Sequence, residues 1–414
     1  MTENELPAEA IADPRTFTDP TALYGLLERL RRDDPLPVIN ADDHDPVRLV
    51  TRHADVMAVE RQSERFINKP RQAHFSKSQM EASRKALGGV DVGKFMRNLV
   101  SMDGPDHHAY REITQSYFTP KGLEGLRGEI ERLATEVVGR MADHGGTCDF
   151  AQVALAYPLR VIMTMLGVPV EDEPLMLRLT QQTLTSQDPE FRAQGGSSMG
   201  AMMEMYLYFQ KMIADRRANP RGDLASIIAN ARVGGELLPE ADVFGYFNII
   251  ATAGHDTTSY AITGGLLALL EHPEEMAKLR SDPSLMPTAV EEIIRWTTSV
   301  KHFCRTAAED CQLEGEEIKA GELLLLSYPS ANRDEAVFGD PHVFRVDRKP
   351  NRQLAFGFGP HVCLGQYLAR LEISLVMREL LARVDHIELA GTPRYVEGTF
   401  VGGVKYLPVR YTMK

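Results

Sequence analysis

The sequence predicts a mainly helical protein with a small strand-rich part. Through most of the chain, apolar residues recur at the spacing of helices that bury one face. Short strand-like runs gather elsewhere, so we expect the strand-rich part near residues 35–60, 299–330 and 385–414, and helices in the remainder. No Gly/Ser-rich or Pro-rich linker divides the chain, so we expect one domain over residues 1–414.

The first element in chain order is a pair of short strands between residues 35 and 56, placed around an Asp-rich turn. Charged residues spaced among recurring apolar ones predict several helices after it. These helices cover residues 123–141, 158–166, 173–185 and 199–217. Before the last of them, Pro189 and paired glycines predict a mobile connection over residues 186–198.

A long helix is predicted over residues 239–271. Pro239 and Glu240 suit its first turn, and Pro273 cannot continue it. Short strand-like runs follow at residues 312–313, 323–327 and 406–411. A further helix is expected directly after Cys363, where Leu364, Leu368, Leu371 and Leu375 recur at helical spacing.

The composition is that of an ordinary globular protein, and the charge excludes one function class. Of the 414 residues, 43% are hydrophobic and 25% are charged, which is enough for a large core. The net charge of −12 argues against nucleic-acid binding, which needs a basic surface. Residues 1–20 are acidic and polar, so we expect a cytoplasmic protein without a membrane anchor. The four cysteines form no CxxC pair, so neither disulfides nor zinc are expected.

The segment 356–365, F-G-F-G-P-H-V-C-L-G, carries the strongest functional signal. Cys363 stands directly before a helix, where free backbone N–H groups and the helix dipole favour a thiolate. Glycines 357, 359 and 365 let the backbone turn sharply and let a large flat ligand approach. A lone cysteine is more often an inert buried residue, but this combination suits a ligand to haem iron. The segment resembles the haem-binding loop of the cytochrome P-450 family.

A second signal interrupts the long helix at residues 253–258, A-G-H-D-T-T. A glycine, an acid and hydroxyl groups are costly in an apolar helix, and threonine can bond back to the carbonyl four residues earlier and open the helix. By itself the pattern indicates a solvated kink equally well. It resembles the A-G-x-D-T-T motif of the same family. That resemblance makes Asp256 and Thr257 catalytic, as groups that deliver protons during oxygen activation, and places Ala253 and Gly254 over the haem.

Two groups of charged residues gain meaning from the same resemblance. Glu292 and Arg295 lie one turn apart, a spacing that alone usually marks a solvated helix face. They resemble the E-x-x-R motif of the family, which implies a structural triad with Arg348 that holds the cysteine loop without touching substrate.

Haem propionates need cationic or hydrogen-bonding partners. Residues 103–111 resemble the family segment D-x-P-x-H-x-x-x-R, and two further basic positions match as well, although each alone would more often be a surface charge. The residues that the resemblance assigns to the cofactor are Cys363, His107, Arg111, Arg305, His361, Phe356, Gly357, Gly365, Ala253 and Gly254.

The resemblance covers nearly the whole chain and is greatest to the α-terpineol-hydroxylating group of soluble bacterial members. It implies the cytochrome P-450 fold, a triangular prism with haem b between the long central helix and the helix after the cysteine. By position in the family, the substrate pocket would be lined by Phe95, Met96, Ile250, Ala253, Val300, Phe303, Phe400 and Val401.

The implied function is a haem-thiolate monooxygenase that inserts one oxygen atom from O2 into a C–H bond of a small apolar substrate, a terpenoid or an aromatic hydrocarbon. Electrons would come from an iron–sulfur ferredoxin and its reductase, since the chain shows no flavin or nicotinamide domain; we expect a monomer. Alternatives are a steroid or fatty-acid hydroxylase, a peroxide-driven peroxygenase, and a haem-based binding protein that does not turn over. The last would have no use for Asp256 and Thr257.

Overall fold

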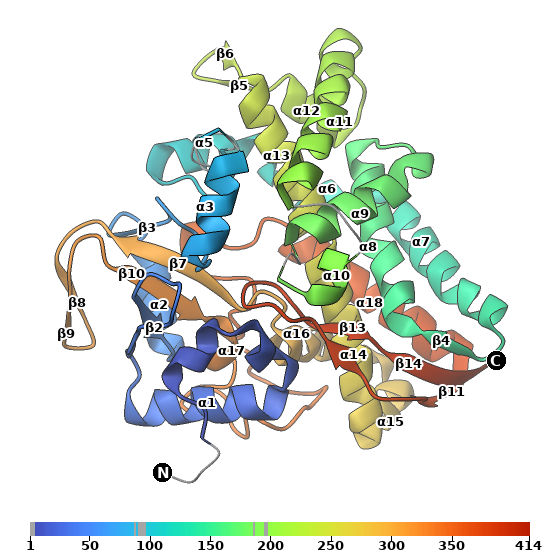
Figure 1. Ribbon diagram of the computed structural model, residues 1–414. Coiled ribbons are helices and arrows are strands. Elements are labelled where there is room, and N and C mark those ends of the chain that lie inside the picture. The colour runs from blue at the N-terminus through green and yellow to red at the C-terminus, as the bar shows by residue number, and fades with distance from the viewer. Residues whose placement is uncertain (1–4, 87, 90–96, 185–186, 194–197) are drawn as a thin grey trace.

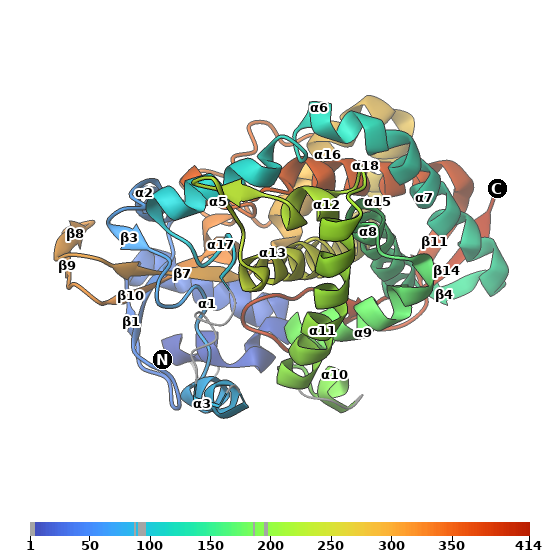
Figure 2. The same cartoon turned by 90° about the horizontal axis from the view of Figure 1, so that it is seen from above.

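The computed structural model describes residues 5–86, 88–89, 97–184, 187–193 and 198–414. It has a broad, roughly triangular outline in Figure 1 and is flatter in the view turned by 90° (Figure 2). The main sheet lies at one side in both views, and helices fill most of the rest. Helices make up 56% of the protein, so the predicted mainly helical fold with a small strand-rich part is confirmed.

Most of the helices pack around one large apolar core. The helices of the first half are α1 (Pro20–Asp33), α2 (His53–Arg61), α3 (Lys77–Ala86), α5 (Gly104–Gln115), α6 (Pro120–Leu123), α7 (Arg127–Gly139), α8 (Phe150–Leu166), α9 (Glu173–Leu184) and α10 (Pro189–Ala193). Those that follow are α11 (Ser198–Ala218), α12 (Leu224–Ala229), α13 (Glu240–Ala253), α14 (Asp256–Glu271), α15 (Pro273–Ser281), α16 (Met286–Thr297), α17 (Tyr328–Ala331) and α18 (Gln366–Arg383).

The main sheet joins strands from residues 38–67 to strands from residues 302–327, and its order among the described residues is β1-β2-β10-β7-β3. These strands are β1 (Val38–Ile39), β2 (Val47–Val50), β3 (Phe66–Ile67), β7 (His302–Ala307) and β10 (Leu323–Ser327). A second sheet has the order β11-β14-β4, with β11 (Val384–Leu389), β14 (Pro408–Met413) and β4 (Thr147–Asp149). The remaining pairs are β5 (Arg232–Val233) with β6 (Glu236–Leu237), β8 (Cys311–Leu313) with β9 (Glu316–Ile318), and β12 (Arg394–Tyr395) with β13 (Val404–Tyr406).

The strand β10 is buried along its whole length because both faces of the main sheet are covered. Leu324 and Leu326 pack into the apolar cluster on one face, and Leu323 and Leu325 pack into the cluster on the other. The strand β10 pairs with β2 on one side and with β7 on the other. The sheet therefore holds β7, with Phe303 and Arg305, against the N-terminal strands.

The predicted long helix over residues 239–271 is wrong in one respect, because it is two helices. The helix α13 ends at Ala253 and α14 begins at Asp256. Gly254 sits against Ile162, whose Cδ1 would lie 2.6 Å from any Cβ at this position. The hydroxyl of Thr257 donates to the carbonyl of Ala253 at 2.9 Å, as the sequence predicts for a threonine here. The break thus places the backbone of residues 253–254 at a cavity inside the molecule.

Two other predicted boundaries also differ. The helix α8 does not begin at Pro158 but at Phe150, because Asp149 accepts a hydrogen bond from the backbone N–H of Ala151 and caps the helix. Pro158 is tolerated inside a helix that is buried along most of its length. The connection predicted over residues 186–198 contains the short helix α10, although residues 186 and 194–197 lie outside the described part.

The segment before Cys363 is held by one buried carboxylate. Glu292 on α16 accepts hydrogen bonds from Arg295 at 2.7 and 2.8 Å and from Arg348 at 3.0 Å at both oxygens. Asn351 donates to the same carboxylate at 3.1 Å. Burial opposes ionisation of Glu292, but the hydrogen bonds and charges of both arginines outweigh it and lower the pKa of this carboxyl. The two guanidinium groups also donate to carbonyls of residues 332–343, so the cluster ties α16 to the polypeptide that leads to the cysteine loop.

We expect Glu292→Ala to prevent stable folding of the holoprotein. The substitution leaves Arg295 and Arg348 buried without a counter-charge, which typically costs about 3–5 kcal/mol. Glu291→Ala is a matched control, because Glu291 pairs with the half-buried Arg370 and its loss should cost less than about 1 kcal/mol. Thermal unfolding and haem content of both variants check this. Equal losses in the two variants would contradict a special role for Glu292.

Candidate active site

A large cavity lies between the α13–α14 break and the loop that precedes α18. It has a volume of about 1490 Å³, part of it open to solvent. Its walls are mostly apolar, and its polar side chains gather near the cysteine loop and the sheet. A cavity that is mainly apolar with a few convergent polar groups is typical of a site for a cofactor or a small molecule.

The cysteine loop closes one side of this cavity. Cys363 lies three residues before α18, and its backbone N–H donates to the carbonyl of Phe356 at 2.8 Å. Gly357 and Gly359 have φ angles of 69° and 71°, which favour glycine, and a Cβ on Gly359 would lie 2.5 Å from a backbone oxygen of Glu60. The glycines therefore allow the tight turn that presents Cys363 to the cavity.

Burial raises the pKa of the Cys363 thiol, and the backbone hydrogen bond from Gly365 and the charge of Arg111 only partly oppose it. At this site the start of the helix therefore does not outweigh burial in setting the pKa of the thiol. A bound metal ion deprotonates a coordinating thiol outright, so the site suits a thiolate formed by ligation rather than one that exists beforehand.

All four predicted propionate partners line the cavity on the side of the main sheet. The rings of His107 and His361 stack with centroids 3.9 Å apart, and Arg111 donates to the carbonyl of Val362 at 2.8 Å. Burial lowers the pKa of His107 to about 4 and that of His361 to about 3, so both rings are neutral near pH 7 and can donate hydrogen bonds. The arrangement joins two histidines and two guanidinium groups, which suits a pair of carboxylates.

Glu60 on α2 lines the same part of the cavity, and no sequence pattern predicted it. Tyr328 donates to Glu60 Oε1 at 2.7 Å, and Arg305 Nη2 lies 3.4 Å from the same oxygen. Oε2 has no hydrogen-bond partner among the described residues. Burial raises the pKa of the Glu60 carboxyl to about 7, despite the opposing charge of Arg305. Arg305 therefore contacts the Glu60 carboxyl and also lines the cavity.

The α13–α14 break forms the wall opposite the cysteine loop. Ala253, Gly254 and Thr257 line the cavity there. Asp256 does not, because its side chain is fully buried on another side of α14. Ser299 donates to the backbone carbonyl of Thr257 at 2.8 Å and fixes the first turn of α14. The two residues predicted to be catalytic are thus adjacent, but Thr257 alone of the two faces the cavity.

The predicted substrate wall is placed in part. Ile250, Ala253, Val300 and Phe303 line the cavity. Phe400 and Val401 are not among the lining residues, although each contacts one: Val401 pairs with Val300 through a short backbone bridge, and the ring of Phe400 packs edge to face on Phe303. Phe95 and Met96 lie outside the described residues. Apolar lining residues that the prediction omitted include Leu99, Val100, Phe118, Ile162, Ile249 and Ala261.

The residues present fit a haem group. The cavity offers one thiol at the cysteine loop, apolar walls for a flat macrocycle, and four hydrogen-bonding or cationic side chains at one edge for its carboxylates. A Cβ on Gly365 would meet nothing within 4 Å, which leaves room for a large ligand beside Cys363.

Comparison with known proteins identifies the family. The sequence pattern described as Cytochrome P450 matches residues 164–398. Over 416 aligned residues the chain is 40% identical to Cytochrome P450-terp of Pseudomonas sp, covering 98% of this chain and 97% of that protein. The chain belongs to the cytochrome P450 family.

Solved structures of cytochromes P450 agree with this assignment. The crystal structure of CYP108D1 from Novosphingobium aromaticivorans is 43% identical, has a TM-score of 0.91 and is covered over 99% of both chains. Mycobacterium marinum CYP268A2 in complex with pseudoionone is 29% identical with a TM-score of 0.89, over 99% of this chain and 100% of that one. The predicted P450 fold, its bacterial group and the enzyme class are confirmed.

As a cytochrome P450, the protein is a monooxygenase whose cofactor is haem b, bound through a cysteine thiolate. It requires O2, a substrate and redox partners. Of the four cysteines, all within the described residues, Cys363 alone lines the cavity. Across the described ranges, no helix combines the length and the apolar character needed to cross a membrane.

We expect Glu60→Gln to flatten the pH dependence of stability. Because the pKa of Glu60 is raised from 4.5 to about 7, the folded protein keeps a proton that the unfolded chain loses in this window. Stability therefore falls as the pH rises through it, by up to about 3 kcal/mol from this carboxyl. In Glu60→Gln this loss is absent, so the variant should gain in Tm on the wild type between about pH 5 and pH 7.

Thermal unfolding of the holoenzyme as a function of pH measures this effect. Glu64→Gln on the exposed surface nearby is the control and should follow the wild type. A Glu60→Gln variant whose Tm runs parallel to that of the wild type at every pH would show that Glu60 does not titrate in this window.

Proposed function

We propose that Cys363 is the iron ligand, and that the protein hydroxylates a small neutral apolar molecule with electrons from a ferredoxin. The observation that carries the ligand assignment is that Cys363, alone among the cysteines, lines the cavity, opposite the α13–α14 break. When bound, the haem supplies the oxidising chemistry and the thiolate favours O–O cleavage. The protein supplies the ligand, a dry pocket, and protons.

Thr257 and Asp256 are the residues proposed to deliver those protons. Thr257 lines the cavity and holds its hydroxyl on the carbonyl of Ala253 at 2.9 Å, so the hydroxyl oxygen stays free to accept or relay a hydrogen bond. Asp256 is the next residue back along the chain and is completely buried, so it can bring a proton only from within the protein.

His107, Arg111, Arg305 and His361 are proposed to hold the two haem propionates. Their common position at one edge of the cavity supports this role, as does their donor chemistry. Glu60 joins this group as the buried partner of Arg305. Phe356, Gly357 and Gly365 would contact the macrocycle from the side of the cysteine loop.

A neutral apolar substrate is supported by the chemistry of the cavity wall. Ile249, Ile250, Val300 and Phe303 bring only hydrocarbon groups to the space above the cysteine loop. The arginines that line the described part of the cavity, Arg111 and Arg305, both belong to the proposed propionate edge. No other cation in the described lining is placed to hold a substrate carboxylate. Terpenoids and aromatic hydrocarbons are therefore favoured over fatty acids, and steroids are the main alternative.

A ferredoxin is the proposed electron donor, with a docking surface beside the cysteine loop. Acidic ferredoxins are attracted by local basic charge, even on an acidic protein. Arg352 is exposed and leads into the loop, which supports a docking role. Arg370 is less suited, because it pairs with Glu291 and its guanidinium covers the ring of Phe356.

Replacing the ligand tests the central assignment. Cys363→His should still bind haem but lose the long-wavelength Soret band of the reduced carbon-monoxide complex, because that band needs a thiolate ligand. Cys311→Ser, on the peripheral strand β8, should keep the band and serves as the matched control. If the band survived in Cys363→His, another ligand would hold the iron and the assignment would be wrong.

Spectral titration tests the substrate class. Neutral terpenoids and aromatic hydrocarbons should shift the Soret band of the ferric holoenzyme more strongly than long-chain fatty acids do. Ile250→Ala should weaken binding of the best ligand by roughly tenfold, through lost apolar contact. The exposed Ile227→Ala should not change it. Tight binding of fatty acids, with none of terpenoids or aromatics, would contradict a neutral substrate.

A further inference from the structure

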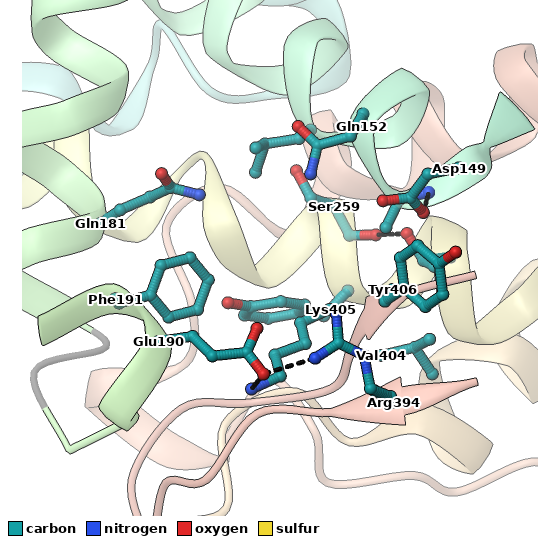
Figure 3. Close-up of a pocket in the computed structure, with 14 residues that line it drawn as sticks. Asp149, Gln152, Gln181, Glu190, Phe191, Ser259, Arg394, Val404, Lys405 and Tyr406 are labelled. Carbon is teal, nitrogen blue, oxygen red and sulfur yellow. Dashed lines mark hydrogen bonds and ion pairs between the residues drawn. The ribbon is translucent and has the colours of Figure 1, made fainter. Parts of the chain in front are cut away.

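His255 and Asp256 are fully buried at the start of α14, a helix that lines two cavities. On one side is the large cavity described above, lined by Gly254 and Thr257. On another side is an open polar cleft of about 640 Å³ between α8, α9, α14 and the C-terminal strands. Figure 3 shows Gln152, Gln181 and Ser259 facing this cleft from three different helices. His255 and Asp256 line neither cavity, but two residues that line the cleft bond to His255: its ring contacts the carbonyl of Leu155, and the hydroxyl of Ser259 donates to its backbone carbonyl at 3.1 Å.

The contacts of the His255 ring determine where its hydrogen sits. The ring is completely buried, and Nε2 lies 3.1 Å from the backbone carbonyl of Leu155, a residue that lines the cleft. A carbonyl oxygen can only accept, so Nε2 carries the hydrogen. In the neutral ring, Nδ1 is then a hydrogen-bond acceptor. Nδ1 lies 3.1 Å from Asp256 Oδ1 and 3.4 Å from the hydroxyl of Thr180.

Within the described part of the chain, both oxygens of the Asp256 carboxyl are buried and lack a hydrogen-bond partner, although His255 Nδ1 lies 3.1 Å from Oδ1. Burial raises the pKa of the Asp256 carboxyl and lowers that of the His255 ring, although each partner's charge opposes the shift. A neutral acid beside a neutral imidazole therefore fits this site better than a buried ion pair.

The other ionisable groups around the pair do not supply a counter-charge. Tyr260 on α14 is buried and its pKa is raised well above 10 by burial. Asp188, before α10, is committed to Lys405 on β13 at 2.8 Å. Glu190 and Arg394 pair with each other on the outer wall of the cleft, where Figure 3 draws their contact. From α8 and α9 the ring of His255 meets the Leu155 carbonyl and the Thr180 hydroxyl, which are uncharged.

We infer that His255 is a positioning residue for proton delivery, whose Nδ1 accepts the carboxyl hydrogen of Asp256 and holds this residue as an oriented neutral acid on the cleft side of the α13–α14 break. This inference rests on the proposed role of Asp256 and extends it. The proton that Asp256 gives toward Thr257 leaves a carboxylate, and the polar cleft one residue layer away is the side from which solvent returns a proton to it. His255 keeps the carboxyl turned to that side between turnovers.

Infrared spectroscopy of the ferric holoenzyme tests this without turnover. A protonated carboxyl gives a C=O stretching band that is distinct from carboxylate bands, and the band of Asp256 is the one that Asp256→Asn removes. We expect this band at neutral pH in the wild type. His255→Phe should move it to higher frequency through loss of the hydrogen bond, and His255→Asn should restore it, because the amide oxygen can accept at the position of Nδ1.

His272→Phe is the matched control, because His272 lies at the other end of α14 and contacts Trp296 rather than Asp256. It should leave the band unchanged. Absence of an Asp256 band in the wild type, or a band that His255→Phe does not move, would overturn the inference. If His255→Phe fails to fold, His255→Asn alone tests the inference. An Asp256 band in His255→Asn at the frequency of a carboxyl without a hydrogen bond would overturn the inference.

Turnover separates this inference from the proposed function. Asp256→Asn should lower kcat by about 10²-fold and His255→Phe by on the order of tenfold, with a larger solvent isotope effect in both and near wild-type rates in His255→Asn. Unchanged kcat in Asp256→Asn would refute the proposed role of Asp256. A slow Asp256→Asn beside a His255→Phe with wild-type rate and isotope effect would leave that role intact and refute the role of His255.

Discussion

One buried carboxylate sets the position of the cysteine loop. Glu292 binds two arginines from different segments. Both guanidinium groups also donate hydrogen bonds to backbone carbonyls of the polypeptide before the loop. A loop without regular structure cannot hold itself rigid. The placement of Cys363 against the α13–α14 break therefore depends on charges that never touch the cavity. The helical core holds the α13–α14 break, and the cluster of Glu292, Arg295 and Arg348 holds the cysteine loop relative to it.

The interruption of the central helix is the second constraint. A continuous helix would bury its backbone groups and present only side chains to the cavity. Ending α13 at Ala253 and restarting at Asp256 brings a glycine backbone to one side and a buried acid to another within a few residues. The break lowers the local stability of the helix, but it lets neighbouring residues face two environments of different polarity.

The sequence was sufficient where function depends on residues close together in the chain. The cysteine loop was recognisable from its own residue pattern and the A-G-H-D-T-T segment from its resemblance to a family motif, and both contribute residues to one cavity. Glu60 was beyond reach, because α2 has an ordinary helical pattern and nothing local shows that its last turn meets β7. At residues 253–258 the sequence predicted a local opening but not two separate helices, because the contact of Gly254 with Ile162 comes from a distant segment. The start of α8 was missed although its cap is local, since Asp149 accepts from the backbone N–H of Ala151. That Val401 pairs with Val300 could not be predicted either, since a bridge between two backbones leaves no signal in either segment alone.

The packing of Phe400 on Phe303 gives the proposed substrate pocket a second layer of side chains. The two rings meet edge to face with centroids 5.4 Å apart, and Phe400 also contacts Phe75 and His302. Lining residues such as Phe303 would contact the substrate directly, whereas Phe400 would limit how far the Phe303 ring can move. Evolution can therefore widen or stiffen the range of molecular shapes that this enzyme accepts through position 400, while the hydrocarbon surface offered to the substrate keeps its composition.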